Sequence, residues 1–250
     1  MERVKCAPCI RQYTRHPRGF KTRPTIPQLS QVELPMPTTL KIDFVSDVSC
    51  PWCVIGLKAL EQAADRLKGE VTLDMHFQPF ELNPQMGPDG QDITEHLQEK
   101  YGSTPEQLER NREAIAARGA DLGFTFGKGK RSRVYNTFDA HRLLHWAEEK
   151  GVQPQLKHAL FKAYFTDGQD PSNHDVLVRV AGEVGLNADE ARELLASDRF
   201  AEDVREREQL YLQNGIHSVP AIIINERHLI QGGQPVEVFE QALRQIAAQG

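Results

Sequence analysis

Two regions of this sequence have the periodicity of β-strands, one from residue 41 to 80 and one from 221 to 231. A long segment with helical periodicity at 93–213 separates them. Residues 41–45 alternate polar and apolar side chains, a helix stripe follows, and 71–80 again favours a strand. Strand character returns at 221–224, where a short turn leads to 228–231 and a final helix. The chain is therefore expected to fold as a βαβ unit and a ββα unit with a helical segment between them.

This element order is that of an α/β protein with a thioredoxin-like fold and a helical domain inserted in its middle. Within the helical segment, only Phe124-Thr125-Phe126 suggests a further strand. The sequence predicts four regions: a disordered or loosely attached arm at 1–39, the βαβ half at 40–90, the inserted helical domain at 91–214 and the ββα half at 215–250.

Charge is distributed unevenly along the 250 residues. Residues 1–39 carry seven Lys and Arg against two Asp and Glu, and six of the 15 prolines, so the rest has a net charge of −10 within a total of −5. An acidic folded part lacks the basic field that nucleic-acid binding needs, and no apolar run approaches the roughly 18 residues of a membrane helix. The continuous apolar stretch that a secretory signal peptide needs does not follow the basic residues, so we expect a cytoplasmic protein. For the reasons of charge and hydropathy just given, we expect it to bind neither nucleic acid nor membrane.

The basic arm permits two further hypotheses. Its composition is compatible with an Arg-rich organelle address. Met36 directly precedes the patterned part, so an overlong gene start is the other hypothesis, and it predicts that native protein yields no peptides from 1–35.

The chemistry begins at Cys50 and Cys53, which lie where a strand leads into a helix. Unpaired N–H groups and the positive end of the helix dipole favour a thiolate on Cys50, and Pro51 suits a first helical turn. Cys50 can then attack a disulfide, and Cys53 can resolve the mixed disulfide that results. In a reducing cytosol such a pair is catalytic or metal-binding more often than structural.

Cys6 and Cys9 form a second C-x-x-C, which raises the possibility of a shared zinc site. The 40 residues between Cys9 and Cys50 far exceed the roughly 15 to 20 of common zinc ribbons. Cys6 and Cys9 lack a strand-to-helix setting, so incidental or adventitious metal-binding cysteines are favoured over a second redox pair. The histidines at 96, 145, 158, 174 and 228 show no metal-ligand spacing with one another or with Asp and Glu, so no metal site is expected.

Several motifs together are characteristic: Asp-Val-Ser-Cys-Pro-Trp-Cys at 47–53, Pro-Phe-Glu-Leu-Asn-Pro at 79–84, Asn-Thr-Phe-Asp-Ala-His-Arg-Leu-Leu-His-Trp-Ala at 136–147, Ala-Tyr-Phe at 163–165 and Val-Pro at 219–220. Over 40–248 the sequence closely resembles the FrnE-type subgroup of the DsbA-like thioredoxin-fold oxidoreductases, which is related to the 2-hydroxychromene-2-carboxylate isomerases. The resemblance implies a redox-active Cys50 and Cys53 and a cis peptide bond between Val219 and Pro220.

In this fold the loop before that proline lies against the cysteines, so the Val219 backbone can pair with an extended substrate. The resemblance thus implies substrate binding by Val219 and Pro220, with His217 and Ser218 nearby. Relatives often carry Gly where Ser218 stands, and Gly232-Gly233-Gln234 departs mildly from their usual Gly-Ala-Gln.

Three further residues have competing interpretations. Trp52 supplies no charge to stabilise a thiolate, so we predict a reduction potential more negative than the roughly −120 mV of a strong oxidant. The Trp52 ring can equally be a contact surface for substrate. Asp43, on the first strand, is either a buried proton relay for Cys53 or a solvated strand residue. His141 is expected to support packing rather than catalysis.

Two enzymatic functions and one binding function remain. The first is thiol-disulfide exchange with protein or peptide substrates, with no cofactor. The second is a glutathione-dependent isomerase or transferase, for which glutathione is the co-substrate and Cys53 is unnecessary. The third is a redox-regulated holdase, for which nothing in the sequence argues specifically.

Overall fold

The computed structural model describes residues 36–249, so Cys6, Cys9 and nearly all of the predicted arm lie outside the described residues. The strands are β1 Thr38–Ser46, β2 Val71–Pro79, β3 Gln91–Asp92, β4 Arg133–Val134, β5 Ala221–Ile224 and β6 His228–Gln231. The helices are α1 Pro51–Arg66, α2 Ile93–Tyr101, α3 Pro105–Asp121, α4 Phe138–Glu149, α5 Gln153–Phe161, α6 His174–Glu183, α7 Ala188–Leu195, α8 Ala201–Gln213 and α9 Val236–Ala247, with a π-helical turn, η1, at Lys162–Thr166.

A four-stranded sheet in the order β2-β1-β5-β6 forms the centre of the molecule. β1 and β2 are parallel and joined through α1, whereas β5 pairs antiparallel with both β1 and β6. The β5–β6 turn has Asn225 and Glu226 at φ values of 51° and 57°, the left-handed geometry that matches the twist of a tight hairpin. The sheet thus assembles the βαβ and ββα units that the sequence predicts.

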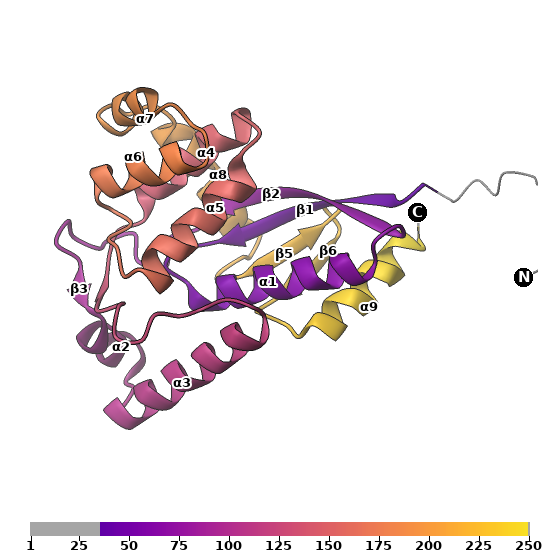
Figure 1. Cartoon of the computed structure of the whole chain (residues 1–250), viewed down its shortest axis with the longest axis horizontal. Helices are drawn as coiled ribbons and strands as arrows, with labels where there is room; N and C mark the ends of the chain where they lie inside the picture. The colour runs from indigo at the N-terminus through magenta and orange to yellow at the C-terminus, as the bar shows by residue number, and fades with distance from the viewer. Residues whose placement is uncertain (1–35, 250) are drawn as a thin grey trace, which may run out of the picture. The chain divides into compact units, whose positions relative to one another are not determined.

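Alternation along β1 sends its side chains to two different cores. Ile42 and Phe44 face α1 and α9 and pack with both cysteines, while Val45 faces the opposite side with Ile216. Figure 1 shows α1 and α9 on one side of the sheet, and the group formed by α4 to α8 beyond its other side and its end. The cysteines therefore belong to the α1 side.

The segment between β2 and β5 is mainly helical, as predicted, but its short strands differ from expectation. Phe124-Thr125-Phe126 forms no strand, because the Phe124 and Phe126 rings pack edge to face, with centroids 4.9 Å apart, and the Phe126 ring meets Phe165 at 5.3 Å. The strands present are β3 and β4, two residues each, which pair antiparallel beside α2. Aromatic burial has outweighed strand pairing at 124–126.

Helix α5 covers the outer edge of β2. The side-chain amide of Gln153 accepts a hydrogen bond from the Phe77 N–H at 2.8 Å and donates one to the Phe77 carbonyl at 3.0 Å. A buried edge strand needs such partners because unpaired backbone groups are costly away from water. Gln153 thus fixes the register between the inserted helices and the sheet.

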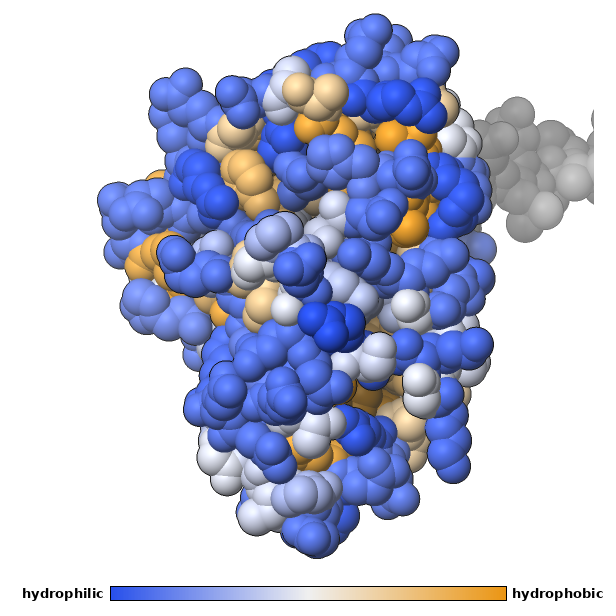
Figure 2. Space-filling model, turned by 90° about the vertical axis from the view of Figure 1, so that its left-hand side faces the viewer, coloured by the Kyte–Doolittle hydropathy of each residue, from blue (hydrophilic) through white to orange (hydrophobic). Residues whose placement is uncertain are grey.

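The face that the helical segment presents in Figure 2 is mostly hydrophilic, with hydrophobic residues in small separate patches. Among the helices of residues 36–249, none combines the length and apolar character that a bilayer crossing requires.

Candidate active site

Cys50 and Cys53 lie at the amino-terminal end of α1. Cys50 is the N-cap residue in an extended conformation, Pro51 occupies the first turn, and the Cys53 N–H donates to the Cys50 carbonyl at 3.1 Å. Cys50 is 4% exposed, and Cys53, one turn further on, is fully buried. Both cysteines are free thiols. The helix end therefore presents Cys50 toward the surface and keeps Cys53 behind it.

The environments of the two sulfurs move their pKa values apart. The neighbouring Cys53 thiol lowers the pKa of Cys50, and backbone N–H groups at 52 and 53 act in the same direction. Burial raises the pKa of Cys53 well above its ordinary value, and the proximity of Cys50 adds to this effect. The surroundings thus favour the thiolate form of Cys50 and the neutral thiol form of Cys53.

The loop at 217–220 meets the first cysteine. The peptide bond between Val219 and Pro220 is cis, the isomer that the family resemblance implies. The Cys50 thiol donates to the Val219 carbonyl at 3.7 Å, and Pro220 is buried. Ser218 and His217 precede them in exposed positions. The structure therefore brings Val219 to the Cys50 sulfur and leaves Ser218 and His217 at the rim.

Pro220 also packs closely on α1. A Cβ atom added at Gly56 would lie 3.0 Å from the Pro220 Cγ, and one added at Gly233 would lie 3.0 Å from the Trp52 carbonyl oxygen. Gly56 and Gly233 thus allow helix and loop to approach with their backbones nearly in contact.

Asp43 is buried but does not reach the cysteines. Its carboxylate accepts a hydrogen bond from the Gln78 amide at 2.7 Å and lies 3.7 Å from the Lys41 ammonium. Because Ile42 and Phe44 face the cysteine side of the sheet, strand alternation points Asp43 to the other side. The structure thus places Asp43 neither as a solvated residue nor beside Cys53.

A second buried acid is Asp47, the first residue of the motif at 47–53, for which the sequence suggested no role. Its two carboxylate oxygens accept from the Ser49 N–H at 2.9 Å and the Leu82 N–H at 2.7 Å. Its carboxylate also lies 3.9 Å from the His141 Nε2. Burial alone would raise the pKa of Asp47, but the contact with His141 and the two backbone bonds outweigh it and lower the pKa. Asp47 is therefore a buried anion that fixes the turn before Cys50.

Two arginines of the helical segment approach the same end of α1. Arg131 donates to the Ser49 carbonyl at 3.2 Å and to the Tyr164 hydroxyl at 2.9 Å. Arg118 of α3 lies over the Trp52 ring at 5.3 Å, and Trp52 is 37% exposed. The rim of the site is therefore aromatic and positively charged.

A buried lysine completes the surroundings of the sulfurs. Lys157 of α5 is fully buried, and it shares the hydrophobic core of the cysteine side through Phe77 and Phe161. Sequence reasoning did not single it out. The available signal was its place at i+4 from Gln153 and at i−4 from Phe161, which puts a lysine on a helix face otherwise devoted to packing.

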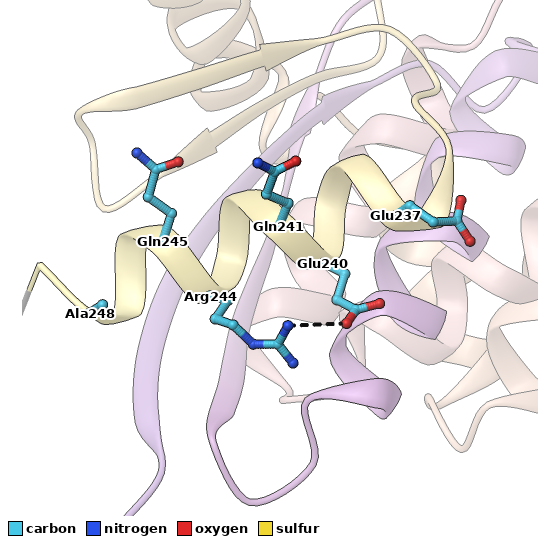
Figure 3. A pocket seen from close by; sticks show the side chains of 6 residues that line it. All are labelled: Glu237, Glu240, Gln241, Arg244, Gln245 and Ala248. Atoms are coloured by element: carbon cyan, nitrogen blue, oxygen red, sulfur yellow. Dashed lines mark ion pairs between the residues drawn. The ribbon is translucent and has the colours of Figure 1, made fainter.

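An open hollow lies on α9, lined by Glu237, Glu240, Gln241, Arg244, Gln245 and Ala248 (Figure 3). Arg66, the last residue of α1, bonds Glu237 and Glu240, so this hollow lies at the opposite end of α1 from Cys50. It takes no part in the cysteine chemistry. No three His, Cys, Asp or Glu side chains within 36–249 are grouped to hold a metal ion.

The match to known proteins agrees with this geometry. The family model for DsbA-like thioredoxin domains matches residues 41–244. The chain belongs to this family. Its members are DsbA-like thiol oxidoreductases and related isomerases, and the α/β fold with its central sheet and many helices is the DsbA-like thioredoxin fold.

Two relatives align over most of the chain. The crystal structure of a probable DsbA oxidoreductase from Streptomyces coelicolor is 32% identical and superposes with a TM-score of 0.78, covering 84% of this chain and 91% of that one. The uncharacterized protein YwbO of Bacillus subtilis is 26% identical over 206 residues, which are 82% of this chain and 96% of the relative.

More distant structures share the fold alone. The cytosolic disulfide reductase DsbM of Pseudomonas aeruginosa, solved with GSH, is 19% identical with a TM-score of 0.59 and covers 83% of this chain and 99% of its own. A 2-hydroxychromene-2-carboxylate isomerase is 14% identical with a TM-score of 0.62 and covers 84% and 97%. This DsbA-like chain thus has both a disulfide reductase and an isomerase among its structural neighbours.

Proposed function

We propose that this DsbA-like protein exchanges disulfides with protein or peptide substrates through Cys50 and Cys53. One observation carries the proposal: two free thiols one turn apart at a helix amino terminus have pKa values displaced in opposite directions. Opposite displacement suits two different roles, because the first thiol must attack as a thiolate and the second must wait until the mixed disulfide has formed.

In the reducing direction, the Cys50 thiolate attacks one sulfur of a substrate disulfide. A bond forms between Cys50 Sγ and that sulfur, and the other substrate sulfur leaves as a thiolate and takes a proton from water. Cys53 then attacks Cys50 Sγ, forms the internal disulfide and releases the second substrate thiolate. Two electrons pass from the cysteine pair to the substrate, and the reverse sequence oxidises a dithiol.

Val219 supplies the means of holding an extended substrate. Its carbonyl already accepts from the Cys50 thiol, and no acceptor meets its N–H among the described residues. A peptide strand laid beside Val219 would gain a main-chain hydrogen bond and bring its sulfur to Cys50. We propose this pairing for substrate binding, with Ser218 and His217 contacting side chains at the rim.

Glutathione is proposed as the small thiol that regenerates the dithiol form, and the cytoplasm as the compartment. The structure of the related DsbM contains GSH, and that reductase is cytosolic. Arg118 and Arg131 beside the cysteines suit a carboxylate-bearing tripeptide.

The test is a redox-buffer titration of the full chain with thiol trapping and peptide mass analysis, which separates Cys50 and Cys53 from Cys6 and Cys9. We expect the Cys50–Cys53 disulfide to form reversibly, with a two-electron reduction potential between about −120 and −270 mV. The potential should be clearly more negative than about −120 mV. The Cys53→Ser variant should accumulate a mixed disulfide with a disulfide-containing peptide, and the Cys50→Ser variant should form none.

If the pair never closes and Cys50 forms only a glutathione mixed disulfide, the proposal is wrong. The glutathione-dependent isomerase or transferase would then become the better account. A potential near −120 mV would leave disulfide exchange standing and contradict the prediction made from Trp52.

A further inference from the structure

Lys157 is a buried lysine that forms no salt bridge with any of the described residues. Its side chain is fully buried, and within the described residues its ammonium nitrogen has no hydrogen-bond partner. The nitrogen lies 4.8 Å from the centre of the Phe161 ring and 5.9 Å from that of Phe77. Lysines are almost never fully buried unless paired, because removing an ammonium from water is costly. A methionine would fill this space at lower cost.

The position of Lys157 is set by the contact between α5 and β2. Gln153 binds both backbone groups of Phe77, and residues four apart lie on one helix face, so Lys157 follows Gln153 toward the same strand. The Phe77 and Phe161 rings that enclose the ammonium belong to the hydrophobic core that also contains Cys50 and Cys53. Lys157 therefore enters the cysteine core from the inserted helices.

The charged groups that act on Lys157 are those of the active site. Burial lowers the pKa of Lys157 to about 8, while Cys53, Asp47 and Cys50 favour its charged form. The effect is reciprocal, since Lys157 lowers the pKa of Cys53 against the burial that raises it.

Except for His145 of α4, whose buried Nδ1 has no hydrogen-bond partner among the described residues, most other titratable groups around α5 have partners of their own. His158 of the same helix pairs with Glu61. On the neighbouring elements, His76 of β2 pairs with Glu148 of α4, His141 of α4 faces Asp47, Tyr164 of η1 donates to the Arg133 carbonyl, and Arg179 of α6 pairs with Glu183.

Resolution of a mixed disulfide poses a problem that Lys157 can solve. Cys53 must become a thiolate, but it is fully buried and burial favours its neutral form. An amine in the same core can accept the proton, and the resulting ammonium stabilises the new thiolate.

We propose that Lys157 is the proton acceptor of Cys53 in the resolving step, an inference that rests on the disulfide exchange proposed above. The neutral Lys157 amine takes the Cys53 proton, and the Cys53 thiolate attacks Cys50 Sγ. The Cys50–Cys53 bond forms as the bond from Cys50 to the substrate sulfur breaks, and the substrate leaves with the bonding pair as a thiolate. Water then protonates that thiolate and removes the proton from Lys157.

The experiment follows both half-steps with 5,5′-dithiobis(2-nitrobenzoate), in full-length protein with Cys6 and Cys9 replaced by serine. Attack by Cys50 releases one coloured thiolate, and resolution by Cys53 releases the second. In Lys157→Met we expect the second release to slow by roughly a hundredfold near pH 7, within the range of general-base catalysis. The first release should change far less, because Cys50 has a weaker charge effect on Lys157 than Cys53 has. The second release should also lose its ionisation near pH 8.

The control is Lys162→Met, which removes an exposed lysine on the following turn that is paired with Asp167. It should leave both releases unchanged. A second release in Lys157→Met that matches the parent, or one that slows while the same pH profile is kept, would contradict the role of Lys157. Absence of the first release in the parent would instead contradict the proposed function.

A measurement on the parent chain does not depend on the variant folding. With isotope-labelled lysine side chains, one Cε resonance should titrate near pH 8 in the dithiol form. In the Cys50–Cys53 disulfide form it should titrate at lower pH, because the thiolate charge that favours the ammonium is gone. Identical titrations of all lysines in the two forms would overturn the proposal.

Discussion

The sheet half and the inserted helices approach the two sulfurs with different chemistry. The sheet half acts mainly through its backbone: the end of α1 faces Cys50, and the Val219 carbonyl accepts from its thiol. The helical segment acts through long cationic side chains, with Lys157 in the core and Arg131 and Arg118 at the rim. The sheet half therefore places the sulfurs and lowers the pKa of Cys50, whereas the helical segment adds positive charge in the core of Cys53 and at the rim.

Asp47 connects these two contributions. It belongs to the turn after β1, where its carboxylate holds the N–H groups of Ser49 and Leu82, and it faces His141 of α4. Its negative charge raises the pKa of Cys50 and favours the ammonium of Lys157. The Asp47 carboxylate therefore acts on a titratable group of each half, on Cys50 in the sheet half and on Lys157 in the helical segment.

The largest effect is expected from removing the charge that the helices supply. Lys157 has its pKa lowered from 10.5 to about 8, and at 1.36 kcal/mol per unit this is about 3 kcal/mol of destabilisation when the lysine is charged. Lys157→Met should therefore raise the free energy of unfolding of the dithiol form by up to about 3 kcal/mol near pH 7.

The sign follows from proton binding. Between pH 8 and 10.5 the unfolded chain holds the lysine proton more tightly than the folded chain, so this lysine makes the parent more stable as pH rises. The advantage of the variant should shrink across that window. Urea unfolding of both proteins in excess dithiothreitol measures this difference in stability. A variant less stable than the parent at pH 7 would contradict a net cost of the buried ammonium.

A smaller effect is expected at the junction. Asp47→Asn keeps one carbonyl oxygen, so either the Ser49 or the Leu82 N–H loses its acceptor, at a cost of about 1–3 kcal/mol. Loss of the negative charge should also lower the pKa of Cys50, measured by thiolate absorbance during a pH titration. The exposed Asp74→Asn is the control. An unchanged Cys50 pKa would show that Asp47 acts only through the backbone.

The smallest effect tests the backbone contribution alone. In Gly56→Ala the added Cβ would lie 3.0 Å from Pro220 Cγ, so the cis-proline loop must shift, and we expect a loss of roughly 1 kcal/mol together with slower turnover. The pKa of Cys50 should not change, because no charge is altered. Gly182→Ala in α6 meets no atom within 4 Å and should gain stability instead. A displaced Cys50 pKa in Gly56→Ala would mean that geometry and charge are not separable.

Local pattern was sufficient for much of the fold. The alternation at 41–45 and the return of strand character at 221–224 predicted the two halves of the sheet, and the motif at Cys50 predicted its place at the start of α1. These features depend on neighbours in sequence. The strand suggested at 124–126 was wrong because aromatic side chains at that point pack against Phe165, a contact far away in sequence.

The buried charges of the site illustrate the same limit. Asp43 attracted attention by its position on the strand before the motif, yet alternation turns it to the other face of the sheet. Asp47 stood inside the motif, but its partners Leu82 and His141 come from other elements.

The sequence by itself determined the place of Cys50 and Cys53 at the start of a helix and the order of the elements around them, because strand and helix periodicity and the start of a helix are local properties. Only the tertiary structure decided which charges surround the sulfurs. Lys157 looks like one more helical lysine until Gln153 docks α5 on the edge of β2, and that docking removes the lysine from water and places it in the core of Cys53. Burial changes a pKa, and burial is a property of the whole fold.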